Sequence, residues 1–236
     1  MSIYAVSDLH GYYNLYEQIC KFIKPEDKIV FLGDAGDRGP DGWKTIKAIY
    51  NNPQWIYLKG NHEDMLVKAM RTMVGEETPL TWEDRWEDPI SLCYYNGGES
   101  TLNGWINDGQ NPAWINALNN LELTYNYINK NNQEIILTHA GFTDNNTIPV
   151  EEELLWNRTH FYNPSRLFTT DRIIIHGHTP IPYLAKKLNK EDNTDIAPLL
   201  YCDGHKIDID CYTFQTKQTV LLNLDTFDWH VFKVEE

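Results

Sequence analysis

Short apolar runs, each followed by polar residues or glycine, recur along the chain and predict buried β-strands. They lie at Ile3–Ser7, Ile29–Leu32, Trp55–Leu58, Ile135–Thr138 and Ile173–Ile175. Between the first two runs the apolar residues change to helical spacing, as Leu15, Ile19 and Phe22 show. This alternation of strand and helix predicts right-handed βαβ units and a core of parallel strands.

The same rhythm continues over the next segment of the chain. Apolar residues repeat at helical spacing over Trp43–Tyr50, and Pro53 then prevents the helix from continuing. A third helix is predicted over Glu63–Met73, beginning just beyond Asn61 and His62. The first 74 residues therefore read as strand, helix, strand, helix, strand and helix.

Alternating apolar and polar residues predict antiparallel strands in the second half of the chain. A β-hairpin is expected from Tyr125–Ile128 and Glu134–Leu137, joined by Asn129–Gln133. Three later runs alternate in the same way, at Lys206–Cys211, Val220–Leu224 and Trp229–Val234. They predict a second sheet packed on the first. The expected fold class is α/β, with two mixed β-sheets packed as a central sandwich that helices flank.

An acidic segment at Gly75–Pro112 interrupts this pattern and carries the sequence Asn96-Gly97-Gly98. Its tryptophans are Trp82, Trp86 and Trp105. The segment can be interpreted as a helical insertion that covers one face, or as a cap that borders a substrate groove. We expect a single domain over residues 1–236, with a helical, cap-like insertion at about 75–112.

Composition narrows the functional classes. The formal net charge of −14 argues against a general nucleic-acid binder, which needs a basic surface. No apolar run approaches the length of a membrane span and no signal segment opens the chain, so a cytoplasmic protein is expected. The cysteines show no metal-type spacing and are expected to be reduced rather than paired in disulfides; they are Cys20, Cys93, Cys202 and Cys211.

A polar motif follows each of the five strands predicted first. The motifs are Asp8-Leu9-His10-Gly11, Gly33-Asp34-Ala35-Gly36-Asp37-Arg38-Gly39, Gly60-Asn61-His62-Glu63, His139-Ala140-Gly141 and Gly177-His178-Thr179. Open α/β sheets place their chemistry at the points where strands end and loops begin. Any one motif could simply cap a turn, but five in one chain indicate a metal centre.

The ligand types specify the chemistry of that centre. Asp8 and His10 are two positions apart, so in an extended segment both point to one side and can bind the same ion. The two carboxylate oxygens of Asp34 can bridge two ions. The full set is Asp8, His10, Asp34, Asn61, His139 and His178. Oxygen and imidazole ligands without thiolate suit Mn²⁺, Fe or Zn²⁺.

These motifs resemble those of the calcineurin-like metallophosphoesterases. The likeness is strongest to the phosphoprotein phosphatase branch, especially the small bacterial and bacteriophage (lambda-type) serine/threonine phosphatases. It is dense over Ile3–Asp64 and resumes at Ile135–Gly141, Trp156-Asn157-Arg158 and Ile173–Pro180. It implies the metallophosphoesterase fold and two metal ions, Mn²⁺ first, with Fe or Zn²⁺ as alternatives. One ion would bind Asp8, His10 and Asp34, and the other would bind Asp34, Asn61, His139 and His178.

The resemblance also implies roles for residues beside the metals. His62 corresponds to the general acid and Asp37 to the residue that holds its imidazole, although Asp37 could instead pair with Arg38 or cap a loop. Arg38 and Arg158 correspond to a phosphate clamp, and a surface arginine is the alternative for Arg158. His176 precedes the expected ligand His178 and is interpreted as a packed histidine.

The implied reaction is hydrolysis of a phosphomonoester by direct attack of a hydroxide that bridges the metals, as in serine/threonine protein phosphatases. The alternative is a dinucleoside tetraphosphate hydrolase, which shares nearly all of these motifs. A metal-stabilised binding module without turnover is a third reading. The expected partner is a phosphorylated protein or a small phosphoester, with no nucleic acid or membrane, and a monomer is expected.

Overall fold

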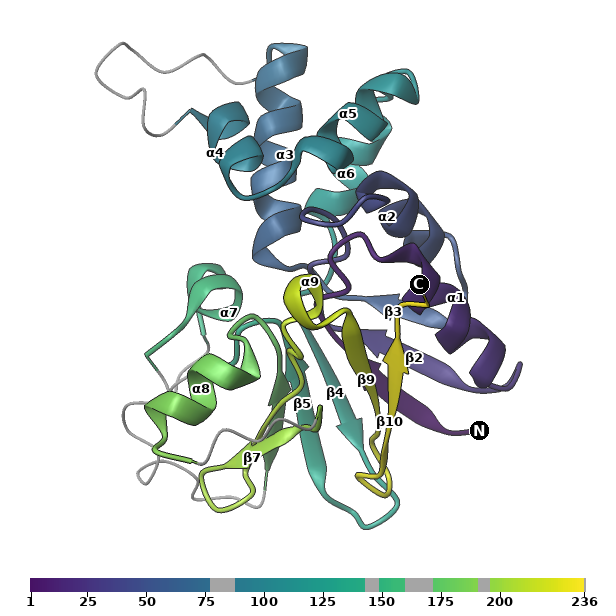
Figure 1. Ribbon diagram of the computed structural model, residues 1–236, viewed down its shortest axis with the longest axis vertical. Helices are drawn as coiled ribbons and strands as arrows, with labels where there is room; N and C mark the ends of the chain where they lie inside the picture. The colour runs from purple at the N-terminus through teal and green to yellow at the C-terminus, as the bar shows by residue number, and fades with distance from the viewer. Residues whose placement is uncertain (77–87, 143–148, 160–171, 191–195, 236) are drawn as a thin grey trace.

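The computed structural model describes residues 1–76, 88–142, 149–159, 172–190 and 196–235. Its strands are β1 (Ile3–Val6), β2 (Lys28–Phe31), β3 (Trp55–Tyr57), β4 (Thr124–Ile128), β5 (Glu134–Thr138), β6 (Ile173–His176), β7 (Leu199–Tyr201), β8 (Lys206–Asp208), β9 (Gln218–Asn223) and β10 (Trp229–Lys233). They form two five-stranded mixed sheets, with the orders β10-β9-β1-β2-β3 and β4-β5-β6-β8-β7. The predicted α/β class is confirmed: the two sheets form a central sandwich that helices flank (Figure 1).

The helices cover the outside of this sandwich. They are α1 (Tyr13–Phe22), α2 (Gly42–Tyr50), α3 (Asn61–Val74), α4 (Pro89–Tyr95), α5 (Glu99–Asn107), α6 (Ala113–Asn119), α7 (Glu151–Trp156), α8 (Ile181–Lys187) and α9 (Thr213–Thr216). In Figure 1, α1 and α2 lie beside the first sheet, α3 to α6 gather at the top, and α7 and α8 lie on the side of the second sheet. No helix among the described residues is both long and apolar enough to span a membrane.

Burial on both faces explains the continuous apolar runs. Val30 and Leu32 of the β2 segment pack between the two sheets against residues such as Ile175, whereas Ile29 and Phe31 pack against the helices. Successive residues of a strand point to opposite faces, so a strand that is covered on both sides needs apolar residues at every position. Among the described residues, all four cysteines are free thiols, as predicted.

Pairing within the sheets confirms part of the predicted topology and corrects part of it. β1, β2 and β3 are parallel, and β4 and β5 form the predicted antiparallel hairpin. The three C-terminal runs, however, do not form one sheet: β9 and β10 join the first sheet, and β8 lies in the second sheet parallel to β6. Alternation along a strand reports which face is buried and not which strand lies next to it.

Helix α3 begins two residues earlier than the sequence pattern predicted, so Asn61 and His62 lie in its first turn. The side chain of Glu63 accepts a hydrogen bond of 2.8 Å from the backbone N–H of Gly60 and so satisfies a donor at the helix start. This cap fixes the direction in which Asn61 and His62 leave the backbone.

The segment at 75–112 contributes α4 and α5, and residues 77–87, with Trp82 and Trp86, lie outside the described residues. Trp105 of α5 is fully buried and belongs to the same apolar cluster as residues of α1, α2 and α3. The assignment of one domain over 1–236 with a cap-like insertion stays a prediction.

Candidate active site

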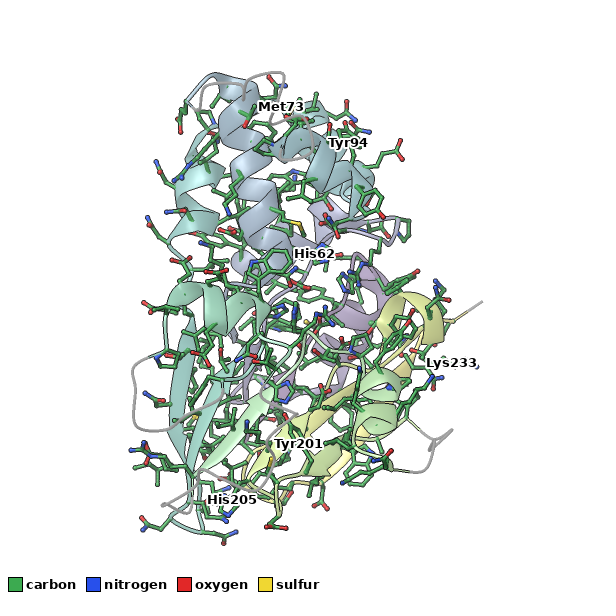
Figure 2. All side chains as sticks on the ribbon, turned by 90° about the vertical axis from the view of Figure 1, so that its left-hand side faces the viewer. His62, Met73, Tyr94, Tyr201, His205 and Lys233 are labelled. Carbon is green, nitrogen blue, oxygen red and sulfur yellow. The ribbon has the colours of Figure 1, made fainter. Side chains whose placement is uncertain are left out.

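The sheet topology brings the predicted ligands together. Each follows the carboxyl end of a strand: Asp8 and His10 follow β1, Asp34 follows β2, Asn61 follows β3, His139 follows β5 and His178 follows β6. All six side chains are buried. Figure 2 shows His62, from the first turn of α3, between the helical cluster and the sheets, whereas His205 lies at the opposite end of the sheets.

Asp34 lies between two groups of ligands. Its Oδ2 atom is 4.0 Å from Nε2 of His10 and 3.8 Å from Nε2 of His62. Its Oδ1 atom is 3.4 Å from Nε2 of His139. The ligand atoms of His10, Asp34 and His62 lie within 4.8 Å of one another, as do those of Asp34, His139 and His178. The two oxygens of one carboxylate therefore face two sites that could each hold an ion.

The donor atoms of the second group fit a cation. Nδ1 of His139 donates a hydrogen bond of 2.8 Å to the carbonyl oxygen of Leu32, so its Nε2 carries a lone pair. That Nε2 lies 2.8 Å from Oδ1 of Asn61, and Nδ1 of His178 lies 2.8 Å from the same oxygen. The lone pairs of His139 Nε2 and Asn61 Oδ1 face each other, and they repel one another unless a positive ion lies between them. Imidazole and amide oxygen are ligands that Mn²⁺, Fe and Zn²⁺ accept.

Burial keeps the histidines available as ligands. Removal from water lowers the pKa of His139 to about 3 and lowers the pKa values of His10 and His178 well below their usual range. A neutral imidazole has a lone pair for a metal, and a protonated one does not. Nδ1 of His10 lies 3.1 Å from the carbonyl oxygen of Gly36, which leaves Nε2 facing Asp34.

The buried carboxylates of the site also favour a bound cation. Burial raises the pKa of Asp8, and the nearby carboxylate of Asp210 raises it further. Burial also raises the pKa of Asp34, with Glu63 as the second cause. Buried acidic groups this close together favour a bound cation, which would stabilise their charged forms.

The backbone at the site is strained because several of its residues have positive φ angles. Six of its residues have positive φ angles, a region that side chains other than glycine rarely adopt. They are Asp8 (52°), His10 (45°), Asp34 (61°), Asp37 (64°), Arg38 (62°) and His178 (67°). Such strain is maintained only where the surrounding structure enforces it, and it concentrates at functional sites.

Glu63 helps to hold the strained backbone around Asp34 in place. Its buried carboxylate accepts hydrogen bonds from the backbone N–H groups of Asp34 at 2.8 Å and Ala35 at 2.9 Å, and from the hydroxyl of Tyr57 at 2.7 Å. With its bond to Gly60, it ties the loop that carries Asp34 to the helix that carries His62. The sequence analysis left Glu63 in its motif without a role. The predicted helix began at Glu63, whereas the observed helix begins at Asn61 and places Glu63 at its third position, where a glutamate can bond back to the helix start.

His62 and Asp37 form a close pair. Nδ1 of His62 lies 2.6 Å from Oδ2 of Asp37, and both side chains are buried. The guanidinium of Arg38 points to the histidines instead, donating to Nε2 of His10 at 2.9 Å and to Nε2 of His62 at 3.0 Å. The Nε2 edge of His62 therefore faces the cavity in front of Asp34.

That cavity has a volume of about 240 Å³. It is lined by two kinds of residue: the polar Asp34, Arg38, Asn61, His62, Arg158 and His178, and the ring-bearing Pro180, Tyr183, Tyr212 and Phe214. Arg158 follows α7, is exposed, and donates a long hydrogen bond of 3.4 Å to the carbonyl oxygen of His178. The two arginines of the expected phosphate clamp thus line one cavity.

His176 turns away from this cavity. Its Nε2 lies 2.6 Å from the hydroxyl of Tyr201, and its Nδ1 lies 2.9 Å from the carbonyl oxygen of Gly177. Burial lowers its pKa to about 3. These contacts match the interpretation of His176 as a packed histidine of β6.

The sequence analysis missed Asp210, which follows β8 at the edge where the other ligands lie. Its side chain is buried, and its Oδ1 accepts a hydrogen bond of 2.8 Å from the N–H of Tyr212. Burial raises its pKa to about 6. A polar residue at the end of an apolar run was the available signal. It went unrecognised because that run was assigned to an antiparallel sheet, whereas β8 is parallel to β6.

The segment from Gly97 to Thr101 holds the backbone of the Arg38 loop. The N–H of Asp37 donates to Oγ1 of Thr101 at 2.7 Å, and the hydroxyl of Ser100 donates to the carbonyl oxygen of Gly39 at 2.6 Å. The sequence predicted either a covering helix or a cap beside the substrate. In the structure, this segment directly contacts the loop that carries Asp37 and Arg38.

Comparison with known proteins assigns the family. The model of the calcineurin-like phosphoesterases matches residues 1–209. The chain belongs to the calcineurin-like phosphoesterase family. This is the family that its motifs predicted.

Relatives of this calcineurin-like phosphoesterase fall into two groups. Serine/threonine-protein phosphatase 2 of Escherichia coli (strain K12) is 34% identical over 76 residues, which are 31% of this chain and 34% of that protein. The symmetrical bis(5'-nucleosyl)-tetraphosphatase of Buchnera aphidicola subsp. Schizaphis graminum (strain Sg) is 41% identical over 109 residues, 43% of this chain and 40% of that protein. The matches thus span between a third and two fifths of these relatives' length.

A solved structure supports the fold over nearly the whole chain. A protein described as a candidate diadenosine tetraphosphatase superposes with a TM-score of 0.62 at 13% identity, covering 98% of this chain and 92% of that one. At this identity the likeness concerns the fold and not the substrate. The comparisons therefore establish the family and the fold of this chain.

Proposed function

We propose that this calcineurin-like phosphoesterase is a phosphomonoesterase of the serine/threonine protein phosphatase type. The observation that carries the proposal is the charge of the surface beside the phosphate clamp. That surface is acidic, which suits a peptide and does not suit a polyphosphate chain.

Two further cavities neighbour the cavity in front of Asp34 and are lined by residues of α7. A second cavity of about 350 Å³ shares Arg158 with the first, and a third of about 760 Å³ shares Trp156 with the second. Trp156 is 40% exposed, and its ring lies edge-on to that of His178 at 6.1 Å. A substrate longer than one phosphate ester could therefore extend from Arg158 past Trp156.

The charges along these cavities disfavour a tetraphosphate. Helix α7 begins with three consecutive glutamates, Glu151, Glu152 and Glu153, which line these outer cavities. Both lysines of the third cavity are paired: Lys59 lies 2.8 Å from Glu151 and 3.4 Å from Asp64, and Lys68 lies 2.8 Å from Asp64. A chain of phosphates would meet carboxylates here and needs cations instead. A peptide backbone carries no such charge.

The proposed roles of the side chains follow from their positions. Two metal ions, Mn²⁺ first with Fe or Zn²⁺ as alternatives, would bind at Asp8, His10, Asp34, Asn61, His139 and His178. When bound they would supply Lewis acidity and a nucleophile at neutral pH. Arg38 and Arg158 bind the phosphoryl oxygens through paired N–H groups, since guanidinium matches phosphate geometry.

His62 completes the reaction by donating a proton from Nε2 to the departing seryl or threonyl oxygen. Asp37 accepts a hydrogen bond from the Nδ1 side of the ring and so fixes its orientation. A scaffold without turnover has no need of such a buried pair, which supports an enzyme over a binding module.

A dinucleoside tetraphosphate hydrolase remains the second candidate. The longer match to the Buchnera tetraphosphatase, 109 residues at 41% identity, favours it. The two functions predict opposite rankings of diadenosine tetraphosphate and a phosphopeptide for the wild-type enzyme.

The test is a substrate panel with Mn²⁺-loaded enzyme. A phosphoserine peptide, diadenosine tetraphosphate and a phosphodiester are compared by kcat/KM, for the wild type and for a Glu152→Gln, Glu153→Gln double variant. We expect the peptide to be the best substrate, and the double variant to improve diadenosine tetraphosphate relative to the peptide. A wild-type kcat/KM for diadenosine tetraphosphate well above that for every phosphopeptide would reject the proposal.

A further inference from the structure

Three aromatic rings form a continuous surface on one side of the catalytic cavity. Phe214 lies in α9 and Tyr212 directly before it, and Tyr183 lies in α8. The rings of Tyr212 and Phe214 are 4.7 Å apart at 80°, and those of Tyr183 and Tyr212 are 5.5 Å apart at 79°. We call these three residues the aromatic wall. All three line the cavity that contains Arg38 and His62.

The inner end of the aromatic wall contacts the phosphate clamp. The guanidinium carbon of Arg38 lies 4.6 Å from the centre of the Phe214 ring, and the same guanidinium donates to His62. An arginine can stack on an aromatic ring and bind a phosphate at the same time, because stacking uses the face of the guanidinium and hydrogen bonds use its N–H edge. The aromatic wall therefore begins where the phosphoryl group is expected to bind.

The outer end of the aromatic wall is open to solvent. Tyr183 is 56% exposed, and its hydroxyl lies 3.2 Å from that of Tyr212. Edge-to-face packing is a favourable geometry for aromatic rings, and it also leaves ring surface free for a further partner. Exposed aromatic surface joined to a polar cavity is typical of a binding site rather than a core.

The backbone holds the aromatic wall in place. Tyr212 has a φ of 58°, an unusual value for a tyrosine, and Oδ1 of Asp210 accepts a hydrogen bond from its N–H. The carbonyl oxygen of Asp210 accepts a hydrogen bond of 2.9 Å from the N–H of Ile181, at the start of the helix that carries Tyr183. One buried residue thus positions both tyrosines, and local strain of this kind is maintained where it serves a function.

The length of the aromatic wall indicates which part of a substrate it meets. Two ring spacings separate Phe214 from Tyr183, so the short side chain of a phosphoserine held by Arg38 would leave Tyr183 uncovered. Consecutive Cα atoms of a peptide are about 3.8 Å apart, so a bend at the phosphoserine would bring the side chain of the next residue toward Tyr183. We propose that the aromatic wall is a subsite for an aromatic side chain next to the phosphorylated residue of the substrate. This proposal rests on the proposed function.

The test uses phosphoserine peptides that differ at one position. Phenylalanine or alanine is placed immediately before or after the phosphoserine, and kcat/KM is measured with Mn²⁺-loaded enzyme. We expect the phenylalanine peptide to be preferred by about tenfold in one of the two registers, the size of one good aromatic contact. Tyr183→Leu should bring this ratio close to one, and Tyr183→Phe, which keeps the ring, should preserve it. Trp229→Leu, which removes an exposed ring of β10 outside the cavity, should leave both ratio and activity unchanged.

The outcomes separate this inference from the proposed function. If phosphopeptides are hydrolysed without a phenylalanine preference, or if Tyr183→Leu keeps the preference, the subsite is disproved while the protein phosphatase stands. A preference confined to phosphotyrosine peptides would also overturn it, because the ring would then belong to the ester itself. If diadenosine tetraphosphate is hydrolysed and no phosphopeptide is, the proposed function fails and the peptide subsite fails with it.

Discussion

The backbone N–H of Arg38 donates a hydrogen bond of 2.7 Å to the carbonyl oxygen of Gly97. Both residues have positive φ angles, 62° for Arg38 and 89° for Gly97. A methyl group on Gly97 would lie 3.0 Å from Cγ and 3.1 Å from the backbone nitrogen of Arg38. The segment between α4 and α5 therefore holds the arginine that is proposed to bind phosphate.

Gly97→Ala should displace Arg38 and weaken phosphate binding. We expect kcat/KM for a phosphoserine peptide to fall by about tenfold or more, mainly through KM, because the clamp acts on bound substrate. Gly109→Ala is the matched control: its φ is 91°, but nothing lies within 4 Å of the added carbon. Both variants should lose roughly 1–2 kcal/mol of stability from the φ angle, and only Gly97→Ala should lose activity. Equal activities would show that Gly97 does not position Arg38.

Thr101→Val should disturb the pair of Asp37 and His62. Oγ1 of buried Thr101 accepts the N–H of Asp37, and valine would leave that donor buried and unpaired at a cost of about 1–3 kcal/mol. We expect lower stability in urea unfolding and a lower kcat for phosphoserine peptides. Thr101→Ser keeps the oxygen and should retain most of both. If Thr101→Ser is as impaired as Thr101→Val, packing rather than the hydrogen bond is the cause.

Metal removal should affect stability as well as activity. Chelation should abolish hydrolysis and Mn²⁺ should restore it. Ions that bind only the folded state stabilise it, by about 2.7 kcal/mol at a hundredfold excess over Kd. The melting temperature should therefore rise with added Mn²⁺. Asp34→Asn should reduce this rise and the metal content, because it weakens a ligand placed between both groups. Full activity with no metal by elemental analysis would refute the mechanism.

His62→Asn should be most harmful when the leaving group is basic. A proposed general acid is worth roughly 10²–10⁴-fold for an alkoxide such as that of phosphoserine, and less for p-nitrophenolate, which leaves without a proton. We expect a much larger fall in kcat for phosphoserine peptides than for p-nitrophenyl phosphate, and a smaller difference of the same kind for Asp37→Asn. Metal content must be unchanged in both variants. Equal losses on the two substrates would assign the proton to another group.

Lys206 should make stability depend on pH above neutrality. Its amine is buried and donates to the carbonyl oxygen of Phe142 at 3.0 Å, and burial lowers its pKa from 10.5 to about 8. Between about pH 8 and 10.5 the unfolded chain binds the proton more strongly, so the free energy of unfolding should rise with pH in this window, by on the order of 1.4 kcal/mol per pKa unit. Denaturant unfolding of the wild type and Lys206→Met should show the difference between them growing over that range. If the difference in free energy of unfolding between the two proteins stays constant over this range, the pKa of Lys206 is not lowered and its amine is in contact with water.

The sequence alone determined the strands that carry the ligands and the residue types at their ends. Apolar runs such as Ile29–Leu32 report burial on both faces, and a motif beginning with Asp34 marks where the chain leaves the core. Both signals are local. The sequence also predicted that β1, β2 and β3 are parallel, because a single helix that connects two neighbouring strands returns the chain to run in the same direction.

The tertiary structure alone decided which distant segments complete the site. The runs Lys206–Cys211 and Val220–Leu224 were both read as antiparallel strands of one sheet, yet β8 joins one sheet and β9 the other, and this choice places Asp210 beside Asp8. The contacts of Gly97 with Arg38, and of Phe214 with the same arginine, join residues far apart in the chain. Partner choice depends on the shape and packing of the whole core, whereas the pattern along one segment records only whether that segment is buried.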